Sequence, residues 1–215
     1  LDGEKVDWYT EDGTLLETGR AYDFPSTTVR AYPTPLGDCG ENLKWMLDRN
    51  SGFLTIYGTG DMWNFSGDAP WMEFQDEIRS LEIKHGVDSI GNWAFYGCGF
   101  TGTLDLPATV RTVGYSAFQG CTGITDLNFS DGLETIGAEA FADCTGIQGE
   151  LNLPNSVSIV DDYAFYGCEN IRGNAYLSAD LKRIGTGAFS GTDIDSFSVS
   201  EDNTSFVSVE GILFT

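Results

Sequence analysis

The chain repeats itself with a period of 23 or 24 residues, and this period limits the available folds more than any other feature. Its marker is an Ala-Phe pair, and successive phenylalanines are separated by 23, 23, 24 and 24 residues. They are Phe95, Phe118, Phe141, Phe165 and Phe189. A unit this short cannot shield its own apolar side chains from water, whereas copies stacked along one axis shield one another. The period therefore predicts a repeat solenoid.

A glycine step recurs in phase with the Ala-Phe pair. Ile-Gly or Val-Gly begins five residues before the phenylalanine in four copies, and Val160-Asp161 takes its place in the other. We expect the glycine to supply a positive φ or room for the chain to turn. Aspartate is tolerated because it also adopts the left-handed conformation.

A cysteine follows each of the first four phenylalanines by three residues, and Thr192 replaces it in the fifth copy. These cysteines are Cys98, Cys121, Cys144 and Cys168. Zinc motifs group thiols two to four residues apart, whereas these stand one coil apart, and in-register stacking suits a disulfide poorly. We therefore expect packing thiols. Cys39 lies outside the array, and the sequence leaves open whether it is free or bridged.

Each unit opens with an alternating triplet, which predicts a brief strand whose outer two side chains face inward. The triplets are Leu81–Ile83, Leu104–Leu106, Leu127–Phe129, Leu151–Leu153, Ala175–Leu177 and Phe197–Val199. Strands stacked about 4.8 Å apart would make an array roughly 25–30 Å long. The expected fold is a mostly β solenoid of five to six units with short helical or 3-10 turns.

If the outer residues of a triplet face inward, its middle residue and the residue before it face outward, on a concave strand face. The candidate ligand-binding residues on this face are Glu82, Asp105, Asp126, Asn128, Glu150, Asn152, Asn174, Tyr176 and Ser198. Carboxylates and amides at fixed spacing could bind a glycan, a basic peptide or Ca²⁺. The competing interpretation is a hydrated sheet surface without a ligand.

A solenoid has open ends that need covering, and residues 39–80 are expected to form the N-terminal cap. We predict strands at 42–47 and 53–57, a turn at 48–52, and a short helix within 70–80. Trp63 and Trp71 should lie over the first repeat, and they are the tryptophans expected to be most exposed. Residues 1–38 are expected to form a separate β-rich segment and linker, which resembles the end of an immunoglobulin-like module, and the repeats are expected to fill residues 81–215.

No constellation for catalysis is visible. The chain has one histidine, His85, and the pattern G-x-S-x-G is never completed. Some of the 33 acidic residues will lie close together by chance, so a carboxylate pair alone proves little. We expect no enzyme activity, no cofactor and no metal.

The balance of acidic and basic residues limits the classes of partner that the chain can bind. The chain has 33 Asp and Glu against 11 Lys and Arg, a formal net charge of −22, which disfavours nucleic acids and anionic membranes. No stretch approaches the roughly 20 apolar residues of a membrane helix, so direct insertion is not expected. We expect a monomer.

The pattern Leu-x-Leu-Pro-x-x-Val-x-x-Ile-Gly-x-x-Ala-Phe-x-Gly-Cys closely resembles the BspA-like leucine-rich repeats of bacterial surface proteins, over about residues 79–215. The best copies are 104–121 and 151–168, and residues 197–214, with Asn203 and Gly211, resemble the variant unit that interrupts such arrays. The segment from Cys39 to Gly60 resembles the lead-in before them.

This resemblance implies an extracellular location on a bacterial cell surface and adhesion to a host surface or matrix protein or to a glycan. The alternatives are a structural spacer of a cell-wall protein, or an accessory segment of a secreted carbohydrate-active enzyme. The chain starts at Leu1 and ends within an apolar run, so we expect a piece of a longer protein whose signal and anchor lie outside it.

Overall fold

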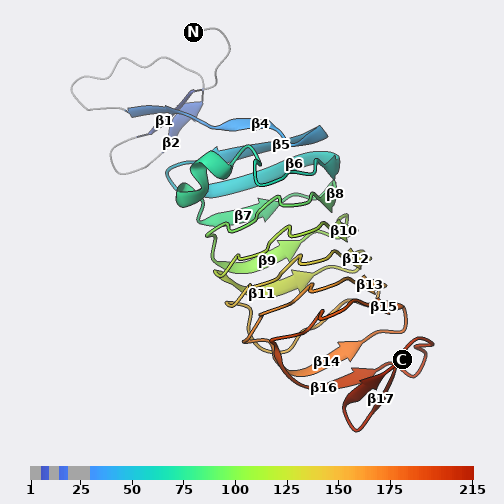
Figure 1. The fold of residues 1–215 in the computed structure, drawn as a ribbon. Helices are drawn as coiled ribbons and strands as arrows, with labels where there is room; N and C mark the ends of the chain where they lie inside the picture. The colour runs from blue at the N-terminus through green and yellow to red at the C-terminus, as the bar shows by residue number, and fades with distance from the viewer. Residues whose placement is uncertain (1–5, 10–14, 19–29) are drawn as a thin grey trace.

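Each repeat forms one coil of a solenoid, and the coils stack into two columns of short parallel strands (Figure 1). The computed structural model describes residues 6–9, 15–18 and 30–215, and side chains from residue 34 onward. One column contains β7 (Ser80–Ile83), β9 (Gly102–Leu106), β11 (Ile124–Phe129), β14 (Arg172–Leu177) and β16 (Asp193–Val199). The other contains β8 (Val87–Ile90), β10 (Thr112–Val113), β12 (Thr135–Ile136), β13 (Ile159–Val160) and β15 (Arg183–Ile184). The predicted solenoid is confirmed.

The second column is the more regular of the two. Val113 of β10 pairs with Ile90 of the preceding coil and with Ile136 of the following coil, in parallel. The same step continues through β13 to β15. Every residue therefore meets its counterpart one repeat away, which is how a phased sequence becomes a continuous sheet.

The repeated phenylalanines form a ladder through the core. Neighbouring rings are stacked with centroids 5.1, 5.3, 5.4 and 5.8 Å apart from Phe95 to Phe189. The first four are fully buried, whereas Phe189 is only partly buried near the C-terminal end of the stack. Each stacked pair contributes about 0.5–1.5 kcal/mol beyond the burial of apolar area, so the ladder helps hold neighbouring coils together.

The repeated cysteines form a second buried ladder beside the phenylalanines. All five cysteines are free and buried. The thiol of Cys121 donates to the Phe95 carbonyl, with 2.9 Å between Sγ and O, and Cys144 donates to Phe118 in the same way at 3.0 Å. Burial raises the pKa of the Cys98 thiol to about 12. These are packing thiols, as expected, and Cys39 is not bridged.

The left-handed residues that recur in each coil do not lie at the Ile-Gly step, where a positive φ was one of the two expectations. The glycine of the Ile-Gly step has no positive φ, but a Cβ on Gly137 would lie only 2.8 Å from the Val113 carbonyl oxygen. Room, and not φ, is therefore what this position requires. The left-handed positions stand two residues before and two residues after the phenylalanine, where Glu139 and Asp143 have φ of 55° and 58°.

The N-terminal cap consists of β4 (Leu36–Asp38), β5 (Gly40–Asp48) and β6 (Phe53–Met62), which form antiparallel pairs. Strand β4 pairs with β5, so the cap sheet includes residues 36–38. Both longer strands extend beyond their predicted ranges, and the turn at 48–52 is present.

The strand β6 covers the ends of both columns. Its first half pairs in parallel with β7, and its second half pairs with β8. This leaves neither column with an exposed N-terminal edge, where unpaired backbone groups would invite another chain to pair. The cap therefore terminates the whole solenoid with one strand.

Trp71 completes the cap and continues the aromatic ladder. It lies just before the 3-10 helix η1 (Met72–Glu77), and its ring stacks on Phe95 with centroids 5.2 Å apart. Its indole Nε1 donates to the Ala94 carbonyl at 2.8 Å. The expectation that Trp71 is exposed was wrong, because its side chain is fully buried as the rung that precedes the first repeat. Trp63 is 50% exposed.

The C-terminal end is a hairpin of β17 (Val207–Val209) and β18 (Ile212–Phe214) packed beside β16. Asn203 anchors the turn before it, because its Nδ2 donates to the carbonyls of Ser178 and Leu181 at 2.6 and 2.9 Å. The variant unit predicted at 197–214 is therefore tied to the coil before it.

The N-terminal segment contains a three-stranded sheet of β1 (Val6–Tyr9), β2 (Leu15–Thr18) and β3 (Arg30–Pro33). The turn expected at 11–13 lies outside the described residues. The similarity of this segment to an immunoglobulin-like module, and the predicted domain boundaries, stay predictions. In the part of the chain that is described, no helix is long and apolar enough to cross a bilayer.

Candidate functional site

The first strand column presents the polar face that the triplets predict. Six of the nine candidate residues are exposed, and Glu82, Asn174 and Ser198 are partly buried. The exposed ones are Asp105, Asp126, Asn128, Glu150, Asn152 and Tyr176. The alternation arises because the flanking side chains, such as Leu104 and Leu106, are 2% exposed and fill the core.

Several of these polar side chains bond to one another across neighbouring strands. Asn128 donates its Nδ2 to Oδ1 of Asp105 at 2.7 Å, one coil away. Asn174 donates to the Ser198 hydroxyl at 2.8 Å. The Glu82 carboxylate forms an ion pair with Lys84. Parts of the face are thus held in fixed positions by their own ladder of hydrogen bonds.

The strand column is interrupted in its middle, which the triplets did not predict. Strand β9 pairs with β11 and β14 pairs with β16, but the triplet Leu151–Leu153 between these pairs forms no regular strand. Residues 149 and 152 form only isolated bridges to residues 171 and 176. The expectation of an unbroken series of strands was therefore wrong at the fourth triplet, and also after the first, because β7 pairs with β6 and not with β9.

A change in spacing within the repeat accompanies this break. Leu104 and Leu127 lie nine residues after their phenylalanines, whereas Leu151 and Ala175 lie ten residues after theirs. One extra residue therefore enters the coil between β11 and Leu151. The coil still donates one backbone bond to β11, from the Gln148 amide to the Thr125 carbonyl, with 3.1 Å between N and O. The spacing alone would not have located the break, because β14 and β16 pair although Ala175 and Phe197 lie ten and eight residues after their phenylalanines.

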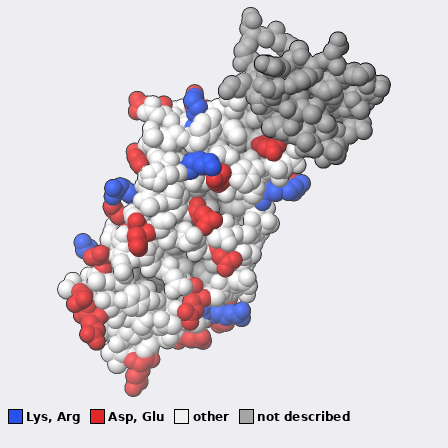
Figure 2. Space-filling model, turned by 180° about the vertical axis from the view of Figure 1, so that it is seen from behind, with Lys and Arg blue, Asp and Glu red and all other residues white. Residues whose placement is uncertain are grey.

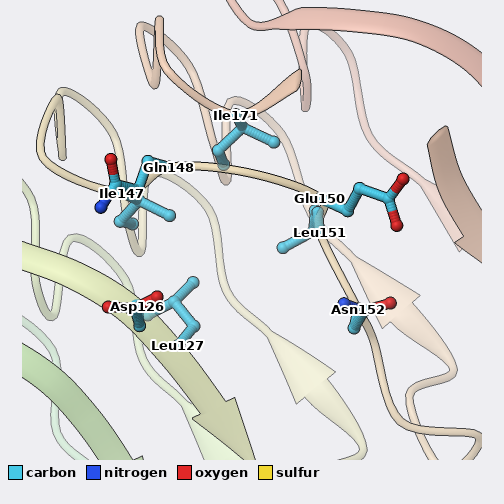
Figure 3. Close-up of a pocket in the computed structure, with 8 residues that line it drawn as sticks. All are labelled: Asp126, Leu127, Ile147, Gln148, Glu150, Leu151, Asn152 and Ile171. Atoms are coloured by element: carbon cyan, nitrogen blue, oxygen red, sulfur yellow. The ribbon is translucent and has the colours of Figure 1, made fainter. Parts of the chain in front are cut away.

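The break opens a pocket of about 150 Å³ on the polar face (Figure 3). It is lined by Asp126, Leu127, Ile147, Gln148, Glu150, Leu151, Asn152 and Ile171. Figure 3 shows Asp126 and Leu127 on β11 and the other labelled residues on the chain that follows it. Three candidate residues from the sequence, Asp126, Glu150 and Asn152, therefore meet at one pocket.

The lining of the pocket is divided between apolar and polar groups. Ile147, Leu151 and Ile171 are at most 4% exposed and belong to the core. Leu127 is only partly buried, although the equivalent Leu104 is 2% exposed, because no regular strand covers its other side. Gln148 and Glu150 are exposed. The pocket therefore combines an apolar base with a rim of two carboxylates and two amides.

The remaining candidate residues lie outside this pocket. Asp105 and Asn128 occupy adjacent strands toward the cap, and Asn174, Tyr176 and Ser198 lie toward the C-terminal end. In the described residues, no group of three or more His, Cys, Asp and Glu is arranged to hold a metal ion. Figure 2, which views the opposite side from Figure 1, shows acidic side chains spread over the surface with few basic ones between them.

The comparisons with known proteins agree on one family. A model of the BspA type leucine-rich repeat region, with six copies, matches residues 88–209, more than half of the chain. No curated protein matches the chain.

Solved structures of bacterial leucine-rich repeat proteins share the fold. One from Eubacterium ventriosum has a TM-score of 0.66 and 19% identity over 85% of this chain and 48% of that one. The pneumococcal vaccine antigen PcpA has a TM-score of 0.59 and 18% identity over 83% of this chain and 53% of that one. A leucine-rich cell surface protein from Faecalibacterium prausnitzii has a TM-score of 0.53 and 19% identity over 83% and 58%. This chain thus spans about half the length of these structures. By its repeats, it belongs to the family of BspA-type leucine-rich repeat proteins.

Proposed function

We propose that this chain is a non-enzymatic, extracellular binding module that presents its polar strand face to a host surface or matrix protein or to a glycan. The observation that carries the proposal is the exposed row of carboxylates, amides and a tyrosine on one strand column, with a pocket at its centre. A surface that combines a shaped apolar pocket with a few placed polar groups is typical of binding sites.

The surface location is supported by the neighbours. One similar structure is a leucine-rich cell surface protein and another is a vaccine antigen. We extend that location to this chain, as part of a bacterial surface protein. The chain acts as a monomer in this proposal, because the stacked coils present the whole face within one copy.

Binding to immobilised host matrix proteins and to a glycan array tests the proposal. The strand-face variant combines Asp105→Ala and Tyr176→Ala, which removes two exposed side chains on either side of the pocket. The matched control combines Asp88→Ala and Tyr166→Ala, which removes the same two residue types, also exposed, away from the strand face. We expect the first variant to weaken binding about tenfold or more and the control to leave it within about twofold.

Two results contradict the proposal. Equal loss of binding in both variants would show that the strand face is not the binding surface. No saturable binding by the unmodified chain would instead favour a structural spacer, whose coils only separate other parts of a larger protein.

A further inference from the structure

The pocket at the strand break has the chemistry of a site for a cation on an apolar stem. Asp126, Gln148, Glu150 and Asn152 form its polar lining, although in Figure 3 the exposed Glu150 carboxylate points away from Asp126. The base is made of Leu127, Ile147, Leu151 and Ile171. Lysine and arginine side chains bury their methylene groups against apolar surface while the charged end stays with polar partners. The methylene groups of such a side chain match the apolar base of the pocket, and its charged end matches the polar rim.

The volume limits the occupant to one side chain. The pocket measures about 150 Å³. A cavity of about 150 Å³ in another protein holds one benzene molecule, which is close in size to the stem and head of a lysine. An oligosaccharide would not fit within this space. The pocket therefore favours a protein partner that inserts a single side chain.

The pocket carboxylates form no ion pair within the described residues, although Oδ2 of Asp126 accepts a hydrogen bond from the Thr125 hydroxyl at 2.7 Å. Within the described residues, the lysines and arginines that form ion pairs do so with other acids, such as Lys84 with Glu82 and Arg111 with Glu134. None of these pairs uses Asp126 or Glu150. The net charge of −22 also draws cationic groups toward the surface and disfavours anionic ones.

We propose that this pocket binds a lysine or arginine side chain of a partner protein, with its methylenes on the apolar base and its charge beside Asp126, toward which the exposed Glu150 side chain turns on binding. This inference rests on the proposed function, because it places the partner on the polar strand face. It adds the chemical class of the group that is recognised at the centre of that face.

The test uses a short peptide with one central lysine flanked by glycines, titrated into the ¹⁵N-labelled chain and followed by NMR. The Gln148 and Asn152 side-chain amides line the pocket and report directly on its occupancy. We expect saturable shifts at these amides and at Leu127, and at least fivefold weaker binding of the same peptide with an acetylated lysine. Acetylation removes the positive charge of the lysine side chain and keeps its methylene groups.

Two variants of equal charge separate recognition in the pocket from general attraction. Asp126→Asn with Glu150→Gln neutralises the pocket, and we expect about fivefold weaker binding of the lysine peptide, the loss of two partly solvated ion pairs. Glu41→Gln with Asp88→Asn neutralises two exposed acids elsewhere and should leave the affinity within about twofold. Circular dichroism confirms that both variants are folded.

Three outcomes would overturn the inference: no shift at the pocket at saturating peptide, equal binding of the acetylated peptide, or equal weakening by both variants. These outcomes are distinct from failure of the proposed function. A glycan or host protein that bound the strand face and shifted Asp105 and Tyr176, but not the pocket, would refute this inference alone.

Discussion

At the scale of single residues, each coil depends on two left-handed positions on either side of the phenylalanine. Glycine fills the second of them in four coils, and Asp143 fills it in the third, with φ of 58°. A residue with a Cβ is strained in this region, although aspartate less than most. The third coil therefore contains a position that glycine would suit better.

We expect Asp143→Gly to raise the free energy of unfolding by about 0.5–1 kcal/mol, because the relief of strain exceeds the entropy that glycine gains in the unfolded chain. Urea denaturation measures the change. Asp131→Gly is the matched control, since Asp131 is exposed and has no positive φ, and it should destabilise the chain. Destabilisation by both substitutions would contradict the assignment of strain.

The buried thiols give a second prediction at this scale. Burial raises the pKa of Cys39 and Cys168 to about 12 from an ordinary value of 9.0. The folded state therefore holds these protons more tightly than the unfolded state. This contribution to stability is complete below about pH 9 and is lost as the pH rises toward 12.

We accordingly expect all five thiols to resist Ellman's reagent at pH 8 in the native state and to react after denaturation. The midpoint of urea unfolding should fall as the pH rises above 9. Rapid reaction of a thiol in the native protein at pH 8 would show that the thiol is not buried as described.

At the scale of elements, the cap and the repeats form one continuous core. Trp71 stacks on Phe95 and donates a hydrogen bond to the first coil, so a cap residue serves as a rung of the repeat ladder. Strand β6 pairs with both columns in the same way. Cap and solenoid should therefore unfold together.

Replacement of Trp71 tests this coupling. We expect Trp71→Ala to lower the free energy of unfolding by about 3–5 kcal/mol, the range for a buried aromatic truncated to alanine. Trp63→Ala should cost less than about 1 kcal/mol, because the Trp63 side chain is 50% exposed. Equal effects of the two substitutions on urea unfolding would contradict the role of Trp71 as the first rung.

At the scale of the whole molecule, the acidic excess opposes the compact stack. A formal charge of −22 on 215 residues creates self-repulsion that the unfolded chain relieves by expanding. Salt screens such charges, since the Debye length falls from about 10 Å at 0.1 M to about 3 Å at 1 M. The stack should therefore be more stable in salt.

We expect the Tm to rise by several degrees as NaCl increases from about 0.02 to 0.5 M, followed by circular dichroism. The reason is the loss of repulsion between acids that Figure 2 shows spread over the surface with few basic residues between them. A Tm that falls over this range would mean that the few ion pairs, such as Arg49 with Glu77, outweigh the repulsion.

The sequence alone determined the solenoid, its phase and the polar face, because burial of one phenylalanine per coil leaves a chain of repeated 23 or 24 residues no other way to hide its apolar side chains. Alternation within each triplet likewise fixed which side chains point outward. Only the tertiary structure decided how adjacent coils align. The extra residue before Leu151 is visible in the sequence, but only the structure shows that this coil keeps a backbone bond from Gln148 to Thr125 of β11 and forms no regular strand beside it. Asp126 and Glu150 share a pocket for that reason, and Trp71 is buried because the cap folds it onto Phe95.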